Sequence, residues 1–353
     1  MNIWSYILKR VLLMIPTLLG VVAITFAVIQ FVPGGPVEQA LMELKGQVGA
    51  SGEASGGGSG QYRGRQGIDA ERVAEIKSLY GFDKPASERF WQMLKGFATF
   101  DLGKSFYHHM DVWQLVVSKL PVSITLGMWT FFLTYLISLP LGIAKAVREG
   151  SRFDSVTSAI VLVGYSIPGF ILGVFLLVMF GGGSFVQWFP LRGLTSDDWE
   201  QLSLTGKVLD YLWHITLPVT ASVAGSFAVM TMLTKNTFLE EIRKQYVLTA
   251  RAKGLSEKTV LYKHVFRNAL IPLVTGFPAA FIGAFFAGSL LIETLFSLDG
   301  LGLLSYESVI RRDYPVVMGT LYLFTLIGLV VKLVGDLCYV WADPRLQFES
   351  LNR

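Results

Sequence analysis

Side chains in the spacing of a catalytic site are almost absent from this 353-residue chain. The nearest approach is GYSIPG, in which Ser166 lacks the second glycine of a GxSxG nucleophile turn. No HExxH zinc motif and no GxxxxGK(S/T) phosphate-binding loop occurs, and Cys338 is the only cysteine. The sequence therefore predicts neither a hydrolase nor a nucleotide site. Ser166 is interpreted as a helical residue that bonds its own backbone before a kink at Pro168.

One stretch does concentrate functional side chains, and they are basic. YVLTARAKGLSEKTVLYKHVFRNALIP, residues 246–272, carries five Lys or Arg residues against the single acid Glu257, and long uncharged runs lie on both sides. Basic residues at the inner face of a membrane can meet an acidic protein groove or anionic lipid headgroups. The alternative is an ordinary inner loop that is retained on that side by its charge alone.

The elements around this stretch are predicted to be membrane-spanning helices. Hydrophobic residues make up 52% of the chain and charged residues 16%, against about 25% charged in an average soluble domain. A helix needs about 20 residues to cross a hydrocarbon core of about 30 Å. Six spans are expected in the uncharged runs 11–32, 120–144, 155–191, 211–234, 268–292 and 314–331. The third run contains GGGS, so its span is expected to end near Phe180.

The first run could instead be a secretory signal, since Lys9 and Arg10 precede it. Its 22 residues exceed the about 7 to 15 of a signal core, and no small-x-small cleavage site follows. We interpret it as an uncleaved anchor.

Basic residues in the short loops predict the orientation. With the N-terminus inside, the inner segments hold 15 Lys and Arg and the two short outer loops hold 4. Both termini and the basic stretch are then cytoplasmic. The net charge of +4 is a topology signal, and nucleic-acid binding is not indicated.

This topology divides the chain into four parts. They are an N-terminal transmembrane helix (1–32), a periplasmic loop domain (33–118) with a Gly/Ser-rich linker (49–60), a core of five transmembrane helices (119–341) with an inner loop (235–268), and a cytoplasmic tail (342–353). After the linker, Val73, Ile76 and Leu79 predict an amphipathic helix from Asp69 to Gly81, either a solvated surface helix or a partner contact.

Few ionisable side chains lie within the spans. Lys332 and Asp336 are one helical turn apart, so they are predicted to form a structural ion pair rather than a proton relay. His214 lies near an outer end. Six prolines within the spans suggest kinks in a helix bundle: Pro16, Pro140, Pro168, Pro218, Pro272 and Pro278.

The basic stretch resembles the cytoplasmic EAA loop of ABC importer permeases, in its peptide-importer form. The positions that match Glu-Ala-Ala are Leu248, Thr249 and Ala250, followed by Gly254, so the glutamate is absent. The proline comes later than in the general pattern, at Pro272. The resemblance extends over nearly the whole chain, in YGFDKP, DLGKS, LPVSITLG, SIPGF, HITLP, ETLFSLDGLG, RDYPVVMG and DPR.

Together these motifs are similar to the first permease subunit of the dipeptide and oligopeptide importers. The resemblance implies an all-α polytopic membrane protein with six transmembrane helices and the type I ABC importer permease fold, located in a bacterial inner (plasma) membrane. It implies oligopeptide cargo, with peptide antibiotics such as microcin C as a variant, no cofactor, and ATP hydrolysis by partners. The implied partners are a second homologous permease subunit (heterodimer), two cytoplasmic ABC ATPase subunits or domains, a periplasmic peptide-binding protein and membrane lipid.

The resemblance also implies which residues form the ATPase-coupling loop. They are Tyr246, Thr249, Ala250, Ala252, Gly254, His264, Arg267, Asn268 and Pro272. From the residues themselves, Gly254 is expected to allow a turn or a close approach between two helical pieces, and Ser256 to cap the second. Val260, Leu261, Val265 and Phe266 are expected on its apolar face. Ala250 and Gly254 are expected where the loop meets the ATPase.

Two outer loops carry mixed charge where a binding protein would dock. Asp197, Asp198, Arg311 and Arg312 are the docking candidates, and ordinary solvated loop charges are the alternative. An ion-coupled secondary transporter or channel is the competing function. No acidic residue near the middle of a span and no half-repeat supports it.

Overall fold

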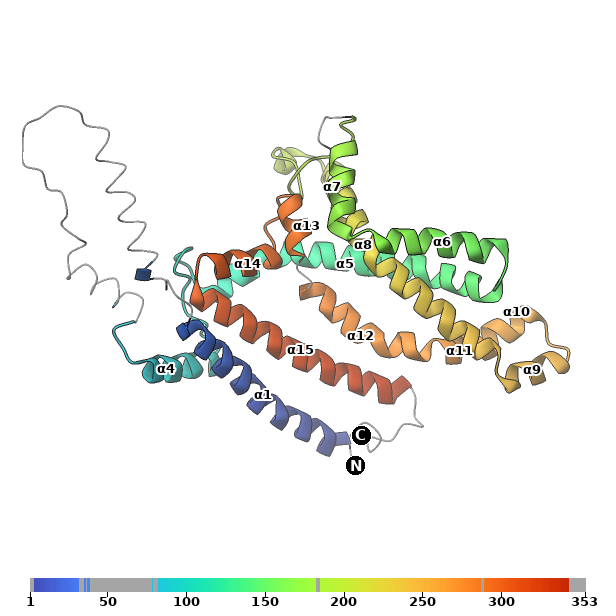
Figure 1. The fold of residues 1–353 in the computed structure, drawn as a ribbon, viewed down its shortest axis with the longest axis horizontal. Helices are drawn as coiled ribbons and strands as arrows, with labels where there is room; N and C mark the ends of the chain where they lie inside the picture. Colours follow the sequence, from blue (N-terminus) through green and yellow to red (C-terminus); the bar gives the residue numbers. More distant parts are fainter. Residues whose placement is uncertain are drawn as a thin grey trace, which may run out of the picture. The chain divides into compact units, whose positions relative to one another are not determined.

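The computed structural model describes residues 3–31, 35, 37–38, 78, 82–181, 185–286 and 289–342. Within these ranges the chain is helical and has no β-strand (Figure 1). The predicted linker 49–60, all of the predicted helix 69–81 except Ser78, and residues 343–353 of the predicted tail lie outside the described residues.

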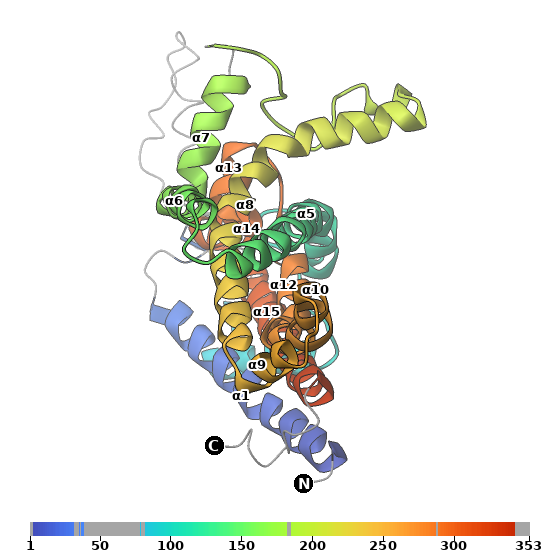
Figure 2. The same cartoon turned by 90° about the vertical axis from the view of Figure 1, so that its right-hand side faces the viewer.

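In the described part of the chain, four helices are long and apolar enough to cross a membrane. They are α1 (Ile3–Phe31), α5 (Val112–Val147), α8 (Leu204–Ile242) and α15 (Tyr314–Ala342). Two bent helix pairs raise the number of candidate spans to six if each pair is one span. α8 contains Pro218 and changes direction part-way along its length (Figure 2).

The third predicted span is sharply bent rather than straight. It consists of α6 (Arg152–Ser166) and α7 (Gly169–Phe180), which meet at 91°. Pro168 lacks an amide hydrogen and forces the preceding residue, Ile167, into an extended conformation. The hydroxyl of Ser166 donates to the Leu162 carbonyl at 2.9 Å, as expected. The predicted end at Phe180 is confirmed.

The fifth predicted span, 268–292, begins at a bend. α12 (Ile271–Phe286) follows a short helical series and is bent from it by 50°. After it come α13 (Leu290–Leu295) and α14 (Leu301–Ile310), and α4 (Ala86–Ala98) lies before α5. The run-length argument does not find these short helices, because none of them is a separate uncharged run of spanning length.

The chain forms two compact units. The first comprises residues 1–12, 119–304 and 327–353, and the second comprises 13–118 and 305–326. In the first unit α6 and α7 pack against α8, and α13 packs against both α7 and α8. Two hydrophobic clusters fill this unit, one around Phe238 and the other around Leu126 and Phe296.

The second unit is held by a buried carboxylate. Asp313 accepts hydrogen bonds from the Ser105 hydroxyl and from the amides of Phe106 (3.0 Å) and Tyr107 (3.3 Å). The rings of Phe97 and Tyr322 pack with their centroids 4.9 Å apart. These contacts fix the 105–107 loop against the start of α15 within this unit.

The predicted ion pair between Lys332 and Asp336 is wrong. Asp336 instead pairs with Arg10 of α1 at 2.8 Å, and the Tyr6 hydroxyl donates to it at 2.9 Å. Lys332 is exposed. An arginine and a tyrosine on a neighbouring helix replace the lysine one turn away, and helical periodicity alone cannot indicate such a partner.

Candidate functional site

The loop between α8 and α12 consists of two short helical pieces joined by a tight turn. α9 (Gln245–Ala252) is followed by Gly254, whose φ of +79° lies in the left-handed region that favours glycine. Ser256 then caps α10 (Glu257–Thr259), because its hydroxyl accepts the Thr259 amide at 3.3 Å. The predicted glycine turn and serine cap are confirmed. The second piece continues as a π-helix, η2 (Val260–Val265), and then as α11 (Phe266–Ala269).

One face of this loop is packed inside the chain itself. Val247, Val260 and Val265 are buried in one hydrophobic cluster with Phe238 of α8, and Leu261 and Phe266 pack against it, so the expected apolar face is confirmed. Ala250 belongs to the same cluster and is only 6% exposed. That Ala250 lies where the loop meets the ATPase stays a prediction. The loop's own helices need a small side chain at this position in order to pack.

A tyrosine hydroxyl ties the two ends of the loop together. Tyr246 donates to the Glu241 carboxylate at 2.6 Å and accepts from the Asn268 side-chain amide at 3.1 Å. Burial and the hydrogen bond to Glu241 raise the pKa of Tyr246 to about 12, so the hydroxyl keeps its proton at neutral pH. The His264 carbonyl lies 3.3 Å from the same hydroxyl. Tyr246, His264 and Asn268 thus serve to hold the loop's shape.

The opposite face of the loop is exposed. Leu248 is 49% exposed, Leu255 39% and Tyr262 60%. The Arg251 guanidinium closes the turn by a two-pronged contact with Glu257, at 2.9 and 3.0 Å. The remaining predicted coupling residues are also exposed, namely Thr249, Ala252, Gly254, Arg267 and Pro272.

The docking candidates occupy two separate loops. Asp197 and Asp198 are exposed in the first unit, just before a 3₁₀ turn at Trp199–Gln201. In the second unit the Arg311 guanidinium lies 3.8 Å from the centre of the Tyr107 ring and 3.5 Å from the Glu307 carboxylate. Arg312 has a φ of +54°, unusual for a residue with a side chain.

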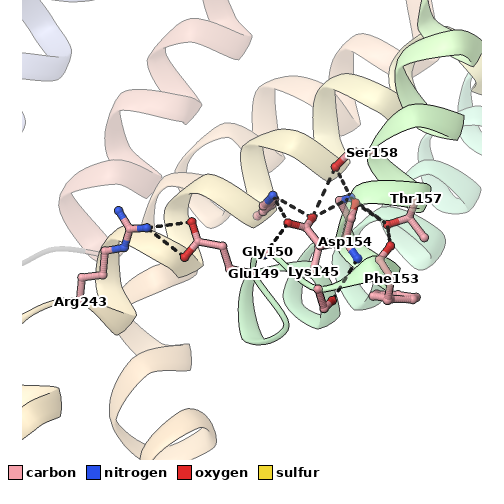
Figure 3. A network of polar contacts seen from close by, with 10 residues as sticks. Lys145, Glu149, Gly150, Phe153, Asp154, Thr157, Ser158 and Arg243 are labelled. Carbon is pink, nitrogen blue, oxygen red and sulfur yellow. Dashed lines mark hydrogen bonds and ion pairs between the residues drawn. The ribbon is translucent and has the colours of Figure 1, made fainter.

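Sequence reasoning missed a buried lysine–aspartate cluster that the structure forms from Lys145, Asp154 and Lys235. Figure 3 shows Lys145 and Asp154, whose ammonium and carboxylate lie 3.1 Å apart. The Asp154 carboxylate also lies 2.8 Å from the Lys235 ammonium. Lys145 is 0% exposed, and its ammonium also donates to Thr157 and Ser158 at 2.9 and 2.7 Å. The cluster joins α5, α6 and α8. The only sequence signal was that each residue ends or interrupts an uncharged run.

A second, exposed ion pair lies near the cluster. Arg243 follows α8 and contacts the Glu149 carboxylate at 2.8 and 2.9 Å (Figure 3). The next residue, Lys244, precedes the first residue of α9. The turn between α5 and α6 is therefore tied to α8 at two levels, immediately before the loop that begins with α9.

Comparison with known proteins identifies the family. The family model described as "Binding-protein-dependent transport system inner membrane component" matches residues 138–348, which include the whole loop described above. The chain belongs to this family. It is accordingly a multi-pass inner-membrane permease subunit of an ABC importer, a transporter that also has ATPase subunits and a substrate-binding protein. The competing ion-coupled carrier is excluded.

Curated relatives match this permease along its length. It is 54% identical to the peptidoglycan transport system permease protein YejB of Agrobacterium fabrum, over 98% of both chains. It is 52% identical to the inner membrane ABC transporter permease protein YejB of Escherichia coli O157:H7, over 98% of this chain and 99% of the other. The dipeptide transport system permease protein DppB of Escherichia coli K12 is 31% identical, over 98% of this chain and 99% of the other.

Proposed function

We propose that this permease imports oligopeptides, and that the 235–268 loop receives the movement of a cytoplasmic ATPase. The observation that carries the second part is Leu248, half-exposed on α9 outside every candidate span. An apolar side chain in that place gains free energy when a partner covers it. The proposed partner groove accepts Leu248 and Leu255, with Arg267 at its rim.

The proposed cycle follows from the construction of the loop. ATP binding closes the ATPase pair and shifts α9, and the population of inward- and outward-open states changes with it. The loop is suited to this work because its inner face is packed on α8 and its two ends are tied through Tyr246. In this proposal the basic inner segments are cytoplasmic, in keeping with the 15 against 4 distribution of Lys and Arg.

The proposed cargo rests on relatives that are named as oligopeptide, dipeptide and peptidoglycan transport proteins. Oligopeptides, including peptides released from peptidoglycan, are the common chemical class. Peptide antibiotics such as microcin C belong to the same class. A periplasmic peptide-binding protein delivers the cargo and contacts Asp197, Asp198, Arg311 and Arg312, and a second homologous permease completes the pore.

The loop proposal is tested by placing a charge on the exposed face. Leu248→Asp should leave the permease in the membrane at normal abundance, because residue 248 is not part of the core. Peptide uptake should be lost and the ATPase subunits should no longer co-purify, because the substitution would bury a carboxylate in the contact. Gly254→Asp should have a weaker effect of the same kind, because no atom lies within 4 Å of an added Cβ and only φ is strained.

Lys258→Ala is the matched control, an exposed change on the same loop, and should transport normally. Ala250→Glu is unsuitable as a test, because it would damage the chain's own core. Normal uptake by Leu248→Asp, or a loss of permease from the membrane, would contradict the proposed contact.

A further inference from the structure

The first unit contains a pocket of about 820 Å³ that no part of the coupling loop lines. Its walls come from α5, α7, α8, α12 and α13, all of which belong to candidate spans or directly follow one. Among the described residues that line it, none is charged. Ligand sites typically enclose about 300–1,000 Å³, so this volume suits a segment of a few peptide residues.

We propose that this pocket binds the neutral backbone of the transported peptide during its passage. The inference rests on the proposed peptide transport and adds the site at which the peptide is held. In this proposal the peptide contacts hydroxyl groups and glycine backbone of the pocket. The pocket therefore recognises the peptide's backbone groups and the width of the peptide, not the charge of its side chains.

Thr134 supplies the first line of support. This α5 residue lines the pocket and is 5% exposed, yet its hydroxyl has no hydrogen-bond partner in the part of the chain that the structure describes. A buried hydroxyl without a partner costs about 1–3 kcal/mol. Threonine hydroxyls in helices commonly bond to the preceding turn, as Thr220 and Thr234 do here at 2.6 and 2.8 Å. The Thr134 oxygen is itself almost fully buried, so a rotation of the side chain toward the pocket brings the free hydroxyl to an occupant.

That hydroxyl argues for a peptide and against the other possible occupants. Lipid tails have no hydrogen-bonding groups, and a transmembrane helix of a partner has its backbone groups bonded internally. An extended peptide carries free amide and carbonyl groups along its length. Among these three, only a peptide supplies the bond from its backbone; a partner helix would need a polar side chain opposite Thr134.

Glycines supply the second line of support, because two kinds of glycine line the pocket. Gly127 is pressed against α12, where an added Cβ would lie 1.7 Å from the Ala284 carbonyl oxygen. Gly169 is similarly pressed against α8, with Ala221 oxygen at 2.8 Å. Gly225 and Gly283 have no atom of the described residues within 4 Å of an added Cβ, so the space directly beside them is open. Gly127 and Gly169 allow the helices of the pocket wall to pack closely, and Gly225 and Gly283 leave room for an occupant.

Narrowing the pocket tests the proposal without disturbing the walls. Gly225→Leu and Gly283→Leu place side chains in open space, so abundance and co-purification of the second permease and the ATPase should be unchanged. In cells that contain the complete importer, uptake of labelled tri-alanine should fall about threefold and that of hexa-alanine at least tenfold. Gly276→Leu and Gly164→Leu are the controls, since an added Cβ there also meets no atom within 4 Å and neither residue lines the pocket.

A second variant tests the contact itself. Thr134→Val removes the hydroxyl at constant shape and should lower uptake about threefold to tenfold, the range of one ordinary hydrogen bond. The reduction should be equal for tripeptides with Glu, Ala or Lys side chains, because the backbone is what is bound. Thr134→Ser keeps the hydroxyl, so this variant should take up peptides at the normal rate.

Each result decides the matter. Normal hexa-alanine uptake in both leucine variants would overturn the pocket assignment and leave peptide transport standing. Loss of the second permease on purification would show that the partner fills the pocket, which also overturns it. Absence of any peptide uptake by the unaltered importer would overturn the proposed function, and the inference with it.

Discussion

The lysine–aspartate cluster and the pocket both include residues of α5 and α8, but they differ in charge and in hydrogen bonding. α5 contributes Lys145 to the cluster and Thr134 to the pocket, while α8 contributes Lys235 and Gly225. The cluster is dense with charge, and its carboxylate contacts both ammonium groups. The pocket has no charge among its described residues and leaves a hydroxyl without a partner. Ionic contacts occur where the helices are fixed to one another, and are absent where space is left open.

The difference has an energetic reason. Moving an ammonium out of water costs several kcal/mol, and the cost is recovered only when a carboxylate and further hydrogen bonds surround it, as they surround Lys145. Such a group holds one geometry. An open pocket lined by charges would instead discriminate between cargoes by the sign of their charge, which does not suit the transport of varied peptides.

Removing the shared carboxylate should have the largest effect. Asp154→Asn leaves two ammonium groups, one of them fully buried, without a counter-charge, and should destabilise the permease by about 3–5 kcal/mol. Abundance in the membrane and the thermal unfolding midpoint of the purified importer measure the loss. A midpoint equal to that of the unaltered protein would show that the cluster is not what joins α5, α6 and α8.

Adding a methyl group where the pocket wall is closely packed should have the second-largest effect on stability. Gly127→Ala would force its Cβ into the Ala284 carbonyl, so we expect a loss of about 1–3 kcal/mol in stability. Gly225→Ala, on the open side, should be neutral by the same thermal measurement. Equal midpoints for the two variants would remove the distinction between the glycines that join the walls and those that leave room.

A charge introduced into the pocket should make the permease select peptides by the sign of their charge. Ser226 lines the pocket and is exposed. The proposed peptide path is water-filled, so the carboxylate of Ser226→Asp should stay solvated there, and permease abundance in the membrane should be close to normal. Two like charges about 4 Å apart repel each other by about 1–4 kcal/mol, depending on how much water lies around them. Uptake of a Glu-containing tripeptide should fall about tenfold relative to its Lys-containing counterpart, and Ser226→Asn should show no such preference. Equal reduction for both peptides would contradict passage of the cargo beside α8.

Local rules predicted the coupling loop well and long-range pairing poorly. The Gly254 turn, the Ser256 cap and the Val260 and Val265 face follow from steric limits and periodicity over a few residues, which the sequence displays directly. The partner of Asp336 and the sharing of Asp154 by two lysines join residues distant in the chain, and no spacing rule indicates them. The 91° bend at Pro168 lies between these cases, since the proline predicts a kink and the tertiary packing sets its angle.

The smallest effect is expected at the exposed ion pair beside the cluster. Glu149 and Arg243 are 42% and 64% exposed, so water screens their attraction and solvates either partner alone. Glu149→Gln should change the thermal midpoint by the equivalent of at most about 1 kcal/mol, and less at high salt. Transport should be close to normal, because the buried lysine–aspartate cluster still ties α8 to the turn between α5 and α6. A loss as large as that of Asp154→Asn would mean that the exposed pair, and not the buried cluster, holds α8 in place ahead of the coupling loop.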